Sequence, residues 1–190
     1  MRLLAEKTVR MTVDEYLRWS CEQSQRPRHE LLDGTPYAMS PERARHALTK
    51  AFIFTALHTA LTQQKMDCIA FPDGMTVKVD EYTAFEPDAL VTCGQKIAGD
   101  DIIIENPLII VEVLSPGTKY IDAGEKLSGY FQIESVRHYL MVDPLKKNVV
   151  HHERNEKGII TTHIIKDGSI SLHPPGIKLA LAKLFEADGD

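Results

Sequence analysis

The most constraining feature of this sequence is a near-continuous apolar run at residues 108–114, Leu-Ile-Ile-Val-Glu-Val-Leu. Its β-branched residues favour a strand, and the lack of polar alternation indicates that both faces of this strand are covered. One carboxylate, Glu112, stands in the middle of the run. Burying an unpaired carboxylate is costly, so Glu112 must meet a cation or a hydrogen-bonding partner. The sequence therefore predicts a central strand that carries one functional acid.

Helices and strands alternate along the rest of the chain. We expect a helix after the capping box of Thr12 and Glu15, and a second helix over residues 41–64 with Ser40 as its N-cap. A third helix is expected over residues 122–134. The remaining expected elements are strands at residues 68–71, 75–79, 87–92, 138–142, 149–150 and 159–165, a hairpin at Asp33-Gly34 and a cap at residues 177–185.

The order of these elements predicts the fold class. A long helix precedes three main strands, and a helix and another strand follow, which is an αβββαβ order with additions at both termini. This order is typical of a mixed α/β (α+β) fold, in which helices flank a central mixed sheet. Because no linker or repeat interrupts the 190 residues, we expect a single domain over residues 1–190.

Composition and charge narrow the classes of function. Apolar residues make up 43% of the chain, but every apolar stretch is too short to span a bilayer, so we expect no membrane partner. The net charge of −5 disfavours a protein that coats nucleic acid non-specifically, yet it allows an enzyme with a basic rim. Cys21, Cys68 and Cys93 include no CxxC pair, which predicts separate buried thiols and a cytoplasmic location.

Two acids are candidates for a metal site. Asp88 begins the apolar segment at residues 87–92, and Glu112 lies in the central strand. If these strands are neighbours, the two carboxylates converge, and oxygen ligands of this kind suit Mg²⁺. Each acid also has a simpler interpretation. Asp88 can be an ordinary strand-start residue, and Glu112 can be the partner of a buried arginine or lysine.

A lysine follows at a suggestive spacing. Asp122, Lys126 and Tyr130 recur at every fourth position, so they share one face of the helix expected after the Glu112 strand. A lysine on that face can orient water and stabilise charge on a phosphoryl oxygen. The alternative interpretation is a solvated lysine that pairs with Asp122.

Two other groups of polar residues are set aside. Asp73 follows a proline, but Gly74 comes next, which indicates a turn and not the start of a strand. His151, His152 and His163 lie in the polar tail with no acidic partner at ligand spacing. We therefore expect these histidines on a solvated face.

Several short motifs occur in an order that resembles a known family. They are residues 29–34 (His-Glu-Leu-Leu-Asp-Gly), Arg45-His46, residues 85–88 (Phe-Glu-Pro-Asp), residues 112–116 (Glu-Val-Leu-Ser-Pro), residues 122–126 and residues 139–144. The two motifs that contain Asp88 and Glu112 resemble the PD-(D/E)XK nuclease superfamily. Within it, most of the chain resembles the Uma family, a bacterial family of proposed restriction endonucleases. This resemblance implies a restriction-endonuclease-like core.

The same resemblance implies a set of site residues. It assigns the metal to Asp88, Glu112 and the backbone carbonyl of Val113, with Mg²⁺ as the cofactor and Mn²⁺ as a substitute. In the superfamily pattern a lysine stands two residues after the glutamate, and this chain has Leu114 there. The resemblance therefore implies that Lys126 has taken over the role of that lysine.

Four further residues are candidates for the site. Lys119, in the loop at residues 116–120, is the nearest rival to Lys126. Glu30 matches a family position that adds a third acid, although it can equally be a hairpin residue at a sheet edge. His46 and Asp122 are expected to support the site.

The function that follows is the metal-dependent hydrolysis of phosphodiester bonds by an endonuclease. Only the family resemblance favours DNA over RNA as the nucleic-acid partner. The alternatives are a catalytically inactive nuclease-fold module that binds DNA or a protein, and a phosphoesterase that acts on small molecules. The antiparallel tail at residues 149–165 offers a sheet edge, so we expect a homodimer.

Overall fold

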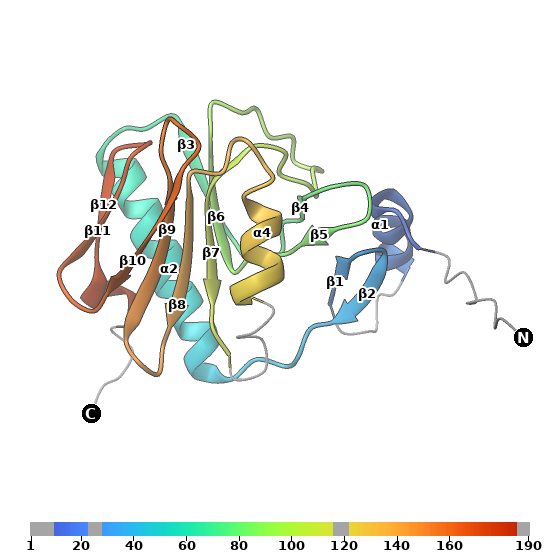
Figure 1. Ribbon diagram of the computed structural model, residues 1–190, viewed down its shortest axis with the longest axis horizontal. Coiled ribbons are helices and arrows are strands. Elements are labelled where there is room, and N and C mark those ends of the chain that lie inside the picture. Colours follow the sequence, from blue (N-terminus) through green and yellow to red (C-terminus); the bar gives the residue numbers. More distant parts are fainter. Residues whose placement is uncertain (1–9, 23–27, 116–121, 186–190) are drawn as a thin grey trace, which may run out of the picture.

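The computed structural model describes residues 10–22, 28–115 and 122–185 (Figure 1). Its helical elements are α1 (Val13–Glu22), α2 (Ala44–Gln63), the π-helical turn η1 (Asp122–Lys126), α4 (Leu127–Tyr130) and the 3-10 turn η2 (Leu181–Leu184). The first strands are β1 (His29–Leu32), β2 (Thr35–Ala38), β3 (Cys68–Pro72), β4 (Val77–Lys78), β5 (Ala84–Phe85) and β6 (Ala89–Cys93). The others are β7 (Pro107–Val113), β8 (His138–Asp143), β9 (Asn148–Arg154), β10 (Ile160–Ile165), β11 (Ser169–Leu172) and β12 (Ile177–Ala180). Within these residues no helix is both long enough and apolar enough to cross a bilayer.

A six-stranded mixed sheet forms the centre of the fold, in the order β10-β9-β8-β7-β6-β3. β7 pairs with β8 in parallel, and the other neighbours are antiparallel. β7 thus lies inside the sheet, as its apolar sequence predicts. The elements α2, β3, β6, β7, α4 and β8 occur along the chain in the expected αβββαβ order, with β4 and β5 inserted between β3 and β6. The predicted mixed α+β fold is thus confirmed.

Helices cover both faces of this sheet. α2 packs on one face against Val111 and Val113, and α4 lies on the opposite face with Ile110, as Figure 1 shows. Because successive side chains of a strand point to opposite faces, Glu112 faces α4. The hairpin of β11 and β12 and the turn η2 complete the core on the α2 side.

A smaller sheet, in the order β2-β1-β5-β4, lies beside the central one. The predicted Asp33-Gly34 turn joins β1 to β2, with φ values of 50° and 77° at these two residues. Gly34 is required here, since a Cβ atom would lie 2.6 Å from the Cβ of Arg10. β1 also pairs with β5 through Leu31 and Ala84, which carries Glu30 to the side of the central sheet where α4 packs.

Two predicted helices have different bounds in the structure. α2 begins at Ala44, and Arg43 before it is extended (φ −88°, ψ 151°), so Ser40 is not its N-cap. Glu42 stays outside the helix and contacts Lys50. The helix predicted to reach residue 134 ends at Tyr130, after which the chain turns so that Val136 packs in the core.

The cysteine prediction is wrong. Cys68 and Cys93 form a disulfide, and Cys21 is free but exposed. The pairing of β3 with β6 sets Cys68 directly opposite Cys93, with their Cα atoms 4.0 Å apart. The two residues are 25 positions apart in the sequence, so only the strand pairing brings them together.

The histidine prediction also needs correction. His151 and His152 are buried, with exposures of 3% and 7%, and only His163 lies on the surface as expected. Their strand, β9, lies between β8 and β10 and is not an edge. His138 donates from Nε2 to the carbonyl of Pro174 at 2.8 Å and accepts at Nδ1 from His151 Nε2 at 2.9 Å. The buried rings therefore satisfy one another.

Candidate active site

Glu112 is buried near the carboxyl end of β7, on the face that α4 covers. Its Oε1 atom accepts hydrogen bonds from Lys126 Nζ at 2.9 Å and from the hydroxyl of Tyr130 at 2.6 Å. Burial raises the pKa of Tyr130, and the nearby charge of Glu112 raises it further, so the phenol stays protonated and donates. The structure thus supplies the cationic partner that a carboxylate in this strand requires.

Lys126 ends the π-helical turn before α4 and is 5% exposed, so the interpretation as a solvated lysine is wrong. Its Nζ lies 2.9 Å from Glu112 Oε1 and 2.9 Å from Glu30 Oε1. Glu30 also accepts a hydrogen bond from the backbone N–H of Glu86 at 2.9 Å. The small sheet therefore delivers a second carboxylate to this lysine, and Glu30 lies at the site and not at a remote sheet edge.

Asp88 precedes β6, next to the end of β7, because the two strands are antiparallel. Its Oδ2 atom accepts a hydrogen bond from the backbone N–H of Val113 at 2.6 Å. Burial raises the pKa of Asp88, while the charges of His46 and Lys50 and the Val113 N–H favour the ionised form. The register pairs Ala89 with Val111, so Asp88 and Glu112 begin and end neighbouring strands at the same end of the sheet.

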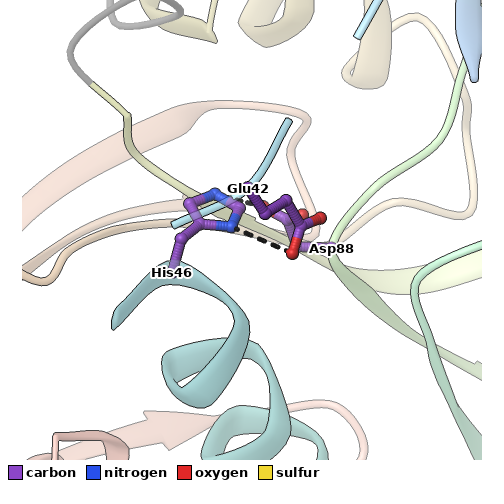
Figure 2. A group of neighbouring side chains, drawn as sticks. All are labelled: Glu42, His46 and Asp88. Carbon is purple, nitrogen blue, oxygen red and sulfur yellow. Dashed lines mark ion pairs between the residues drawn. The ribbon is translucent and has the colours of Figure 1, made fainter. Parts of the chain in front are cut away.

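His46, in the first turns of α2, bridges Asp88 and β7. Its Nε2 donates to the carbonyl of Val113 at 2.8 Å and lies 3.7 Å from Asp88 Oδ2. The other ring nitrogen, Nδ1, is buried without a hydrogen-bond partner and faces Glu42 Oε2 at 3.7 Å. Figure 2 shows Glu42, His46 and Asp88 turned toward one another, and their ligand atoms are close enough to share a metal ion.

A second lysine in this region was missed by sequence reasoning. Lys50, one turn after His46 on α2, is buried; it contacts Glu42, and its Nζ lies 2.7 Å from Asp73 Oδ2 and 3.6 Å from Asp88 Oδ1. Asp73 does lie in a turn, as predicted, but its carboxylate belongs to the site. The spacing of Glu42, His46 and Lys50 at every fourth position was the available signal.

An arginine extends the network of ion pairs. Arg28 contacts Glu86 and lies 2.8 Å from Asp73, so the charged groups form a continuous network from the small sheet to Asp88. Burial alone would raise the pKa of Asp73, but Lys50 and Arg28 outweigh burial and lower it. Burial lowers the pKa of Lys50, but Asp73 and Glu42 outweigh burial, so the pKa is raised. Both groups are therefore charged at neutral pH.

Two predicted residues cannot be placed. Lys119 lies outside the described residues. The backbone of Asp122 belongs to η1, but its side chain is not described, so the expected pair between Asp122 and Lys126 stays a prediction. The partners of Lys126 that the structure describes are Glu112 and Glu30.

The donor set of this region suits a hard divalent cation. Carboxylates outnumber lysine and arginine side chains in the network of ion pairs, which leaves a local excess of negative charge. The carboxylates are Glu30, Glu42, Asp73, Glu86, Asp88 and Glu112, and the cations are Arg28, Lys50 and Lys126. Val113 offers a carbonyl oxygen with a second lone pair beside Asp88. Oxygen donors with surplus negative charge are the chemistry that Mg²⁺ and Mn²⁺ prefer.

Comparison with known proteins identifies the family of this chain. The model of the family described as "Uma2: Putative restriction endonuclease" matches residues 13–182. The chain belongs to the Uma2 family. The match spans every site residue described above, from Arg28 to Tyr130. The family is the one that the sequence motifs resemble, so that resemblance is confirmed.

One relative and one solved structure are similar to this chain over most of its length. The uncharacterized protein slr1290 of Synechocystis sp. is 29% identical over 152 residues, which cover 78% of this chain and 77% of that protein. A crystal structure described as a putative nuclease belonging to DUF820, from Anabaena variabilis, superposes with a TM-score of 0.74 at 16% identity. It covers 93% of this chain and 98% of the other, so the two proteins share the fold over almost their whole lengths.

Proposed function

We propose that this protein is a divalent-metal-dependent endonuclease that hydrolyses phosphodiester bonds in DNA. One observation carries the proposal: Glu112, buried in a central strand, accepts a hydrogen bond from the buried Lys126. The neighbouring strand, β6, follows directly after Asp88. A purely structural core does not require two buried acids and a buried lysine, because apolar side chains would fill the same space without the free-energy cost of desolvating charges. Membership in the Uma2 family supports the same reaction class.

The proposal gives Asp88, Glu112 and the Val113 carbonyl the task of holding Mg²⁺ or Mn²⁺. A bound cation of this kind supplies Lewis acidity toward a phosphoryl oxygen. Val113 N–H fixes the orientation of Asp88, and Tyr130 fixes that of Glu112, so both carboxylates are held before any ligand binds. His46 supports the arrangement through its hydrogen bond to the Val113 carbonyl.

Lys126 has the second task in this proposal. Its ammonium group is held by Glu112 and Glu30, and it lies 5.5 Å from the centre of the Phe85 ring. From this position it orients the attacking water and stabilises the negative charge that grows on the phosphoryl group. The interactions with Glu30 and Phe85 keep the ammonium on one side of Glu112.

The substrate and the cellular setting are the finer parts of the proposal. The description of the Uma2 family as putative restriction endonucleases supports DNA as the proposed substrate. A cytoplasmic location and a single domain over residues 1–190 belong to the same proposal. In such a reducing compartment Cys68 and Cys93 would be held as a dithiol. Cutting both strands of a duplex also favours a homodimer, for which the outer strand β10 offers an exposed edge.

A plasmid-nicking assay with Mg²⁺ or Mn²⁺ tests the proposed activity. The wild-type protein is expected to convert supercoiled DNA to open-circular and linear forms, and chelation of the metal is expected to stop the conversion. Glu112→Gln keeps the shape of the side chain but removes its charge, so it is expected to abolish cleavage. Glu125→Gln, at an exposed acid of the η1 turn, is the matched control and is expected to cleave normally.

The competing function is a nuclease-fold module that binds DNA or a protein without turnover. It would leave DNA intact with every metal while the wild-type protein still retards DNA in a gel. Cleavage of a small phosphodiester but not of DNA would point instead to a phosphoesterase.

A further inference from the structure

Lys50 occupies a position that no part of the proposed reaction has used. Its buried ammonium group lies among Glu42, Asp73 and Asp88, which come from three separate segments of the chain. Nζ lies 2.7 Å from Asp73 and 3.6 Å from Asp88, and it also contacts Glu42. In Figure 2 Glu42 and Asp88 lie together beside His46, next to the start of α2, the helix that carries Lys50.

This environment is what a divalent cation would need. Three carboxylates around one point form an oxygen-rich donor set, and one lysine only partly balances their charge. Asp73 has a second cationic partner in Arg28, whereas Glu42 has His46 as its further partner among the described residues. An ammonium ion and a divalent metal ion therefore compete for the same carboxylate oxygens.

We propose that the ammonium group of Lys50 occupies the position beside Asp88 at which a second divalent ion would otherwise bind. The proposal rests on the metal site proposed above for Asp88 and Glu112. It makes the protein a single-metal site. Asp88 contributes a carboxylate oxygen to that metal, and Lys50 supplies a second positive charge 3.6 Å from Asp88 Oδ1. Lys50 is thus a positioning residue that acts through Asp88.

The geometry explains why a lysine suits this role. Lys50 comes from the second turn of a long, well-packed helix, whose later residues Ile53 and Leu57 are in the core. Its ammonium is covalently tethered, so it remains in place at any concentration of free metal. A second metal ion in that place would bind and leave with the supply of ions.

Calorimetric titration with Mn²⁺ tests this inference without any activity measurement. The wild-type protein is expected to bind one ion, and Lys50→Met, which keeps the length of the side chain but removes the charge, is expected to bind two. Lys50→Met combined with Asp73→Asn is expected to return to one ion, because the second pocket has lost a carboxylate. Lys78→Met, at an exposed lysine of β4, is the matched control and is expected to bind one ion.

The outcomes separate this inference from the proposed metal site. Equal stoichiometry for the wild type and Lys50→Met overturns the inference, and so does a wild type that binds two ions. If the wild type binds no ion and Lys50→Met binds one, the inference stands and the proposed site at Asp88 and Glu112 fails. If neither protein binds an ion, both fail.

Folding of the variant is part of the same test. Lys50→Met leaves carboxylates without their lysine, so its far-ultraviolet circular dichroism is recorded with and without Mn²⁺. If it is unfolded without metal, recovery of the wild-type spectrum on adding Mn²⁺ supports the inference. An unfolded spectrum at saturating Mn²⁺, while Lys50→Arg folds normally, overturns it.

Discussion

Lys126 Nζ lies 2.9 Å from Glu112 Oε1, although the lysine ends the turn before α4 and the glutamate lies near the carboxyl end of β7. The superfamily pattern has its lysine on the same strand as the glutamate, at the position where this chain has Leu114. Leu114 instead packs against the apolar cluster on the α4 side of the sheet. The cation therefore reaches the acid from the facing helix and not along the strand.

Removal of the Lys126 charge is predicted to lower the rate of DNA cleavage. Lys126→Met should cleave roughly 10²-fold more slowly, which is the scale for the loss of one charge-stabilising group. The substitution leaves Glu112 and Glu30 without their lysine. The free energy of unfolding of the variant should therefore also fall, by about 3–5 kcal/mol without metal. Initial nicking rates in Mn²⁺, measured on protein whose circular dichroism shows it folded, provide the check.

Two matched variants test whether Lys126 is specific in this role. Lys119→Ala removes the rival lysine, and Lys146→Ala removes an exposed lysine after β8. Both should cleave at close to the wild-type rate. A wild-type rate for Lys126→Met, or a comparable loss for Lys119→Ala, would refute the assignment.

Acid should destabilise the protein through its buried histidines. Burial and the neighbouring His138 lower the pKa of His151 to about 4, below its ordinary value of 6.5. The unfolded chain therefore binds more protons than the folded chain between these two values, so the free energy of unfolding decreases as the pH falls from 6.5 to 4. Thermal melting at a series of pH values should show the loss.

One substitution isolates the contribution of His151. His151→Gln keeps a donor for His138 but cannot be protonated, so its melting temperature should fall less steeply between pH 6.5 and pH 4. His58→Gln, at an exposed histidine of α2, should retain the wild-type slope. Identical slopes for wild type and His151→Gln would exclude His151 as the source.

Reduction of the Cys68–Cys93 disulfide should lower stability but leave the metal site intact. The bond closes a loop with a sequence separation of 25 residues. Such a loop is worth about 3 kcal/mol in the chain-entropy model. Cys93 lies at the far end of β6 from Asp88, roughly 16 Å away along the strand. Dithiothreitol should therefore lower the melting temperature of the wild type without changing its Mn²⁺ affinity.

The exposed Cys21 offers the control for that experiment. Cys21→Ser should respond to reductant as the wild type does, whereas Cys68→Ser combined with Cys93→Ser should melt at the lower temperature in both conditions. A change in Mn²⁺ affinity on reduction would mean that the disulfide is coupled to the site.

The edge strand β10 should mediate the proposed homodimer. Ile160 and Ile164 are 43% and 65% exposed on this outermost strand, and an unpaired edge can join another chain. Ile164→Lys should shift the protein to monomers in multi-angle light scattering. Ile69→Lys, at a similarly exposed apolar residue of β3 on the opposite edge, should remain dimeric. A wild-type monomer at high concentration would reject the dimer.

The sequence was sufficient for features that depend on local pattern. The apolar run around Glu112 predicted an inner strand, because a strand covered on both faces needs little polar alternation. The Asp33-Gly34 pair predicted the hairpin, since this turn requires positive φ values. Asp88 and Glu112 could be assigned to neighbouring strands once the order of elements was recognised.

The features that were missed depend on contacts between distant segments. The disulfide needs the pairing of β3 with β6, and the role of Asp73 needs the packing of α2 against the turn after β3. The helix does not start at the expected Ser40: Arg43 is extended, and Glu42 lies outside the helix and contacts Lys50. No periodicity within a single segment reports such tertiary contacts.

The most direct test of the central claim is a crystal of the protein soaked in Mn²⁺ and measured at the manganese absorption edge. The account predicts one anomalous peak that contacts a carboxylate oxygen of Asp88, a carboxylate oxygen of Glu112 and the carbonyl oxygen of Val113. At saturating Mn²⁺, no peak in this region, or an ion held by Glu42 and His46 without Glu112, would contradict it.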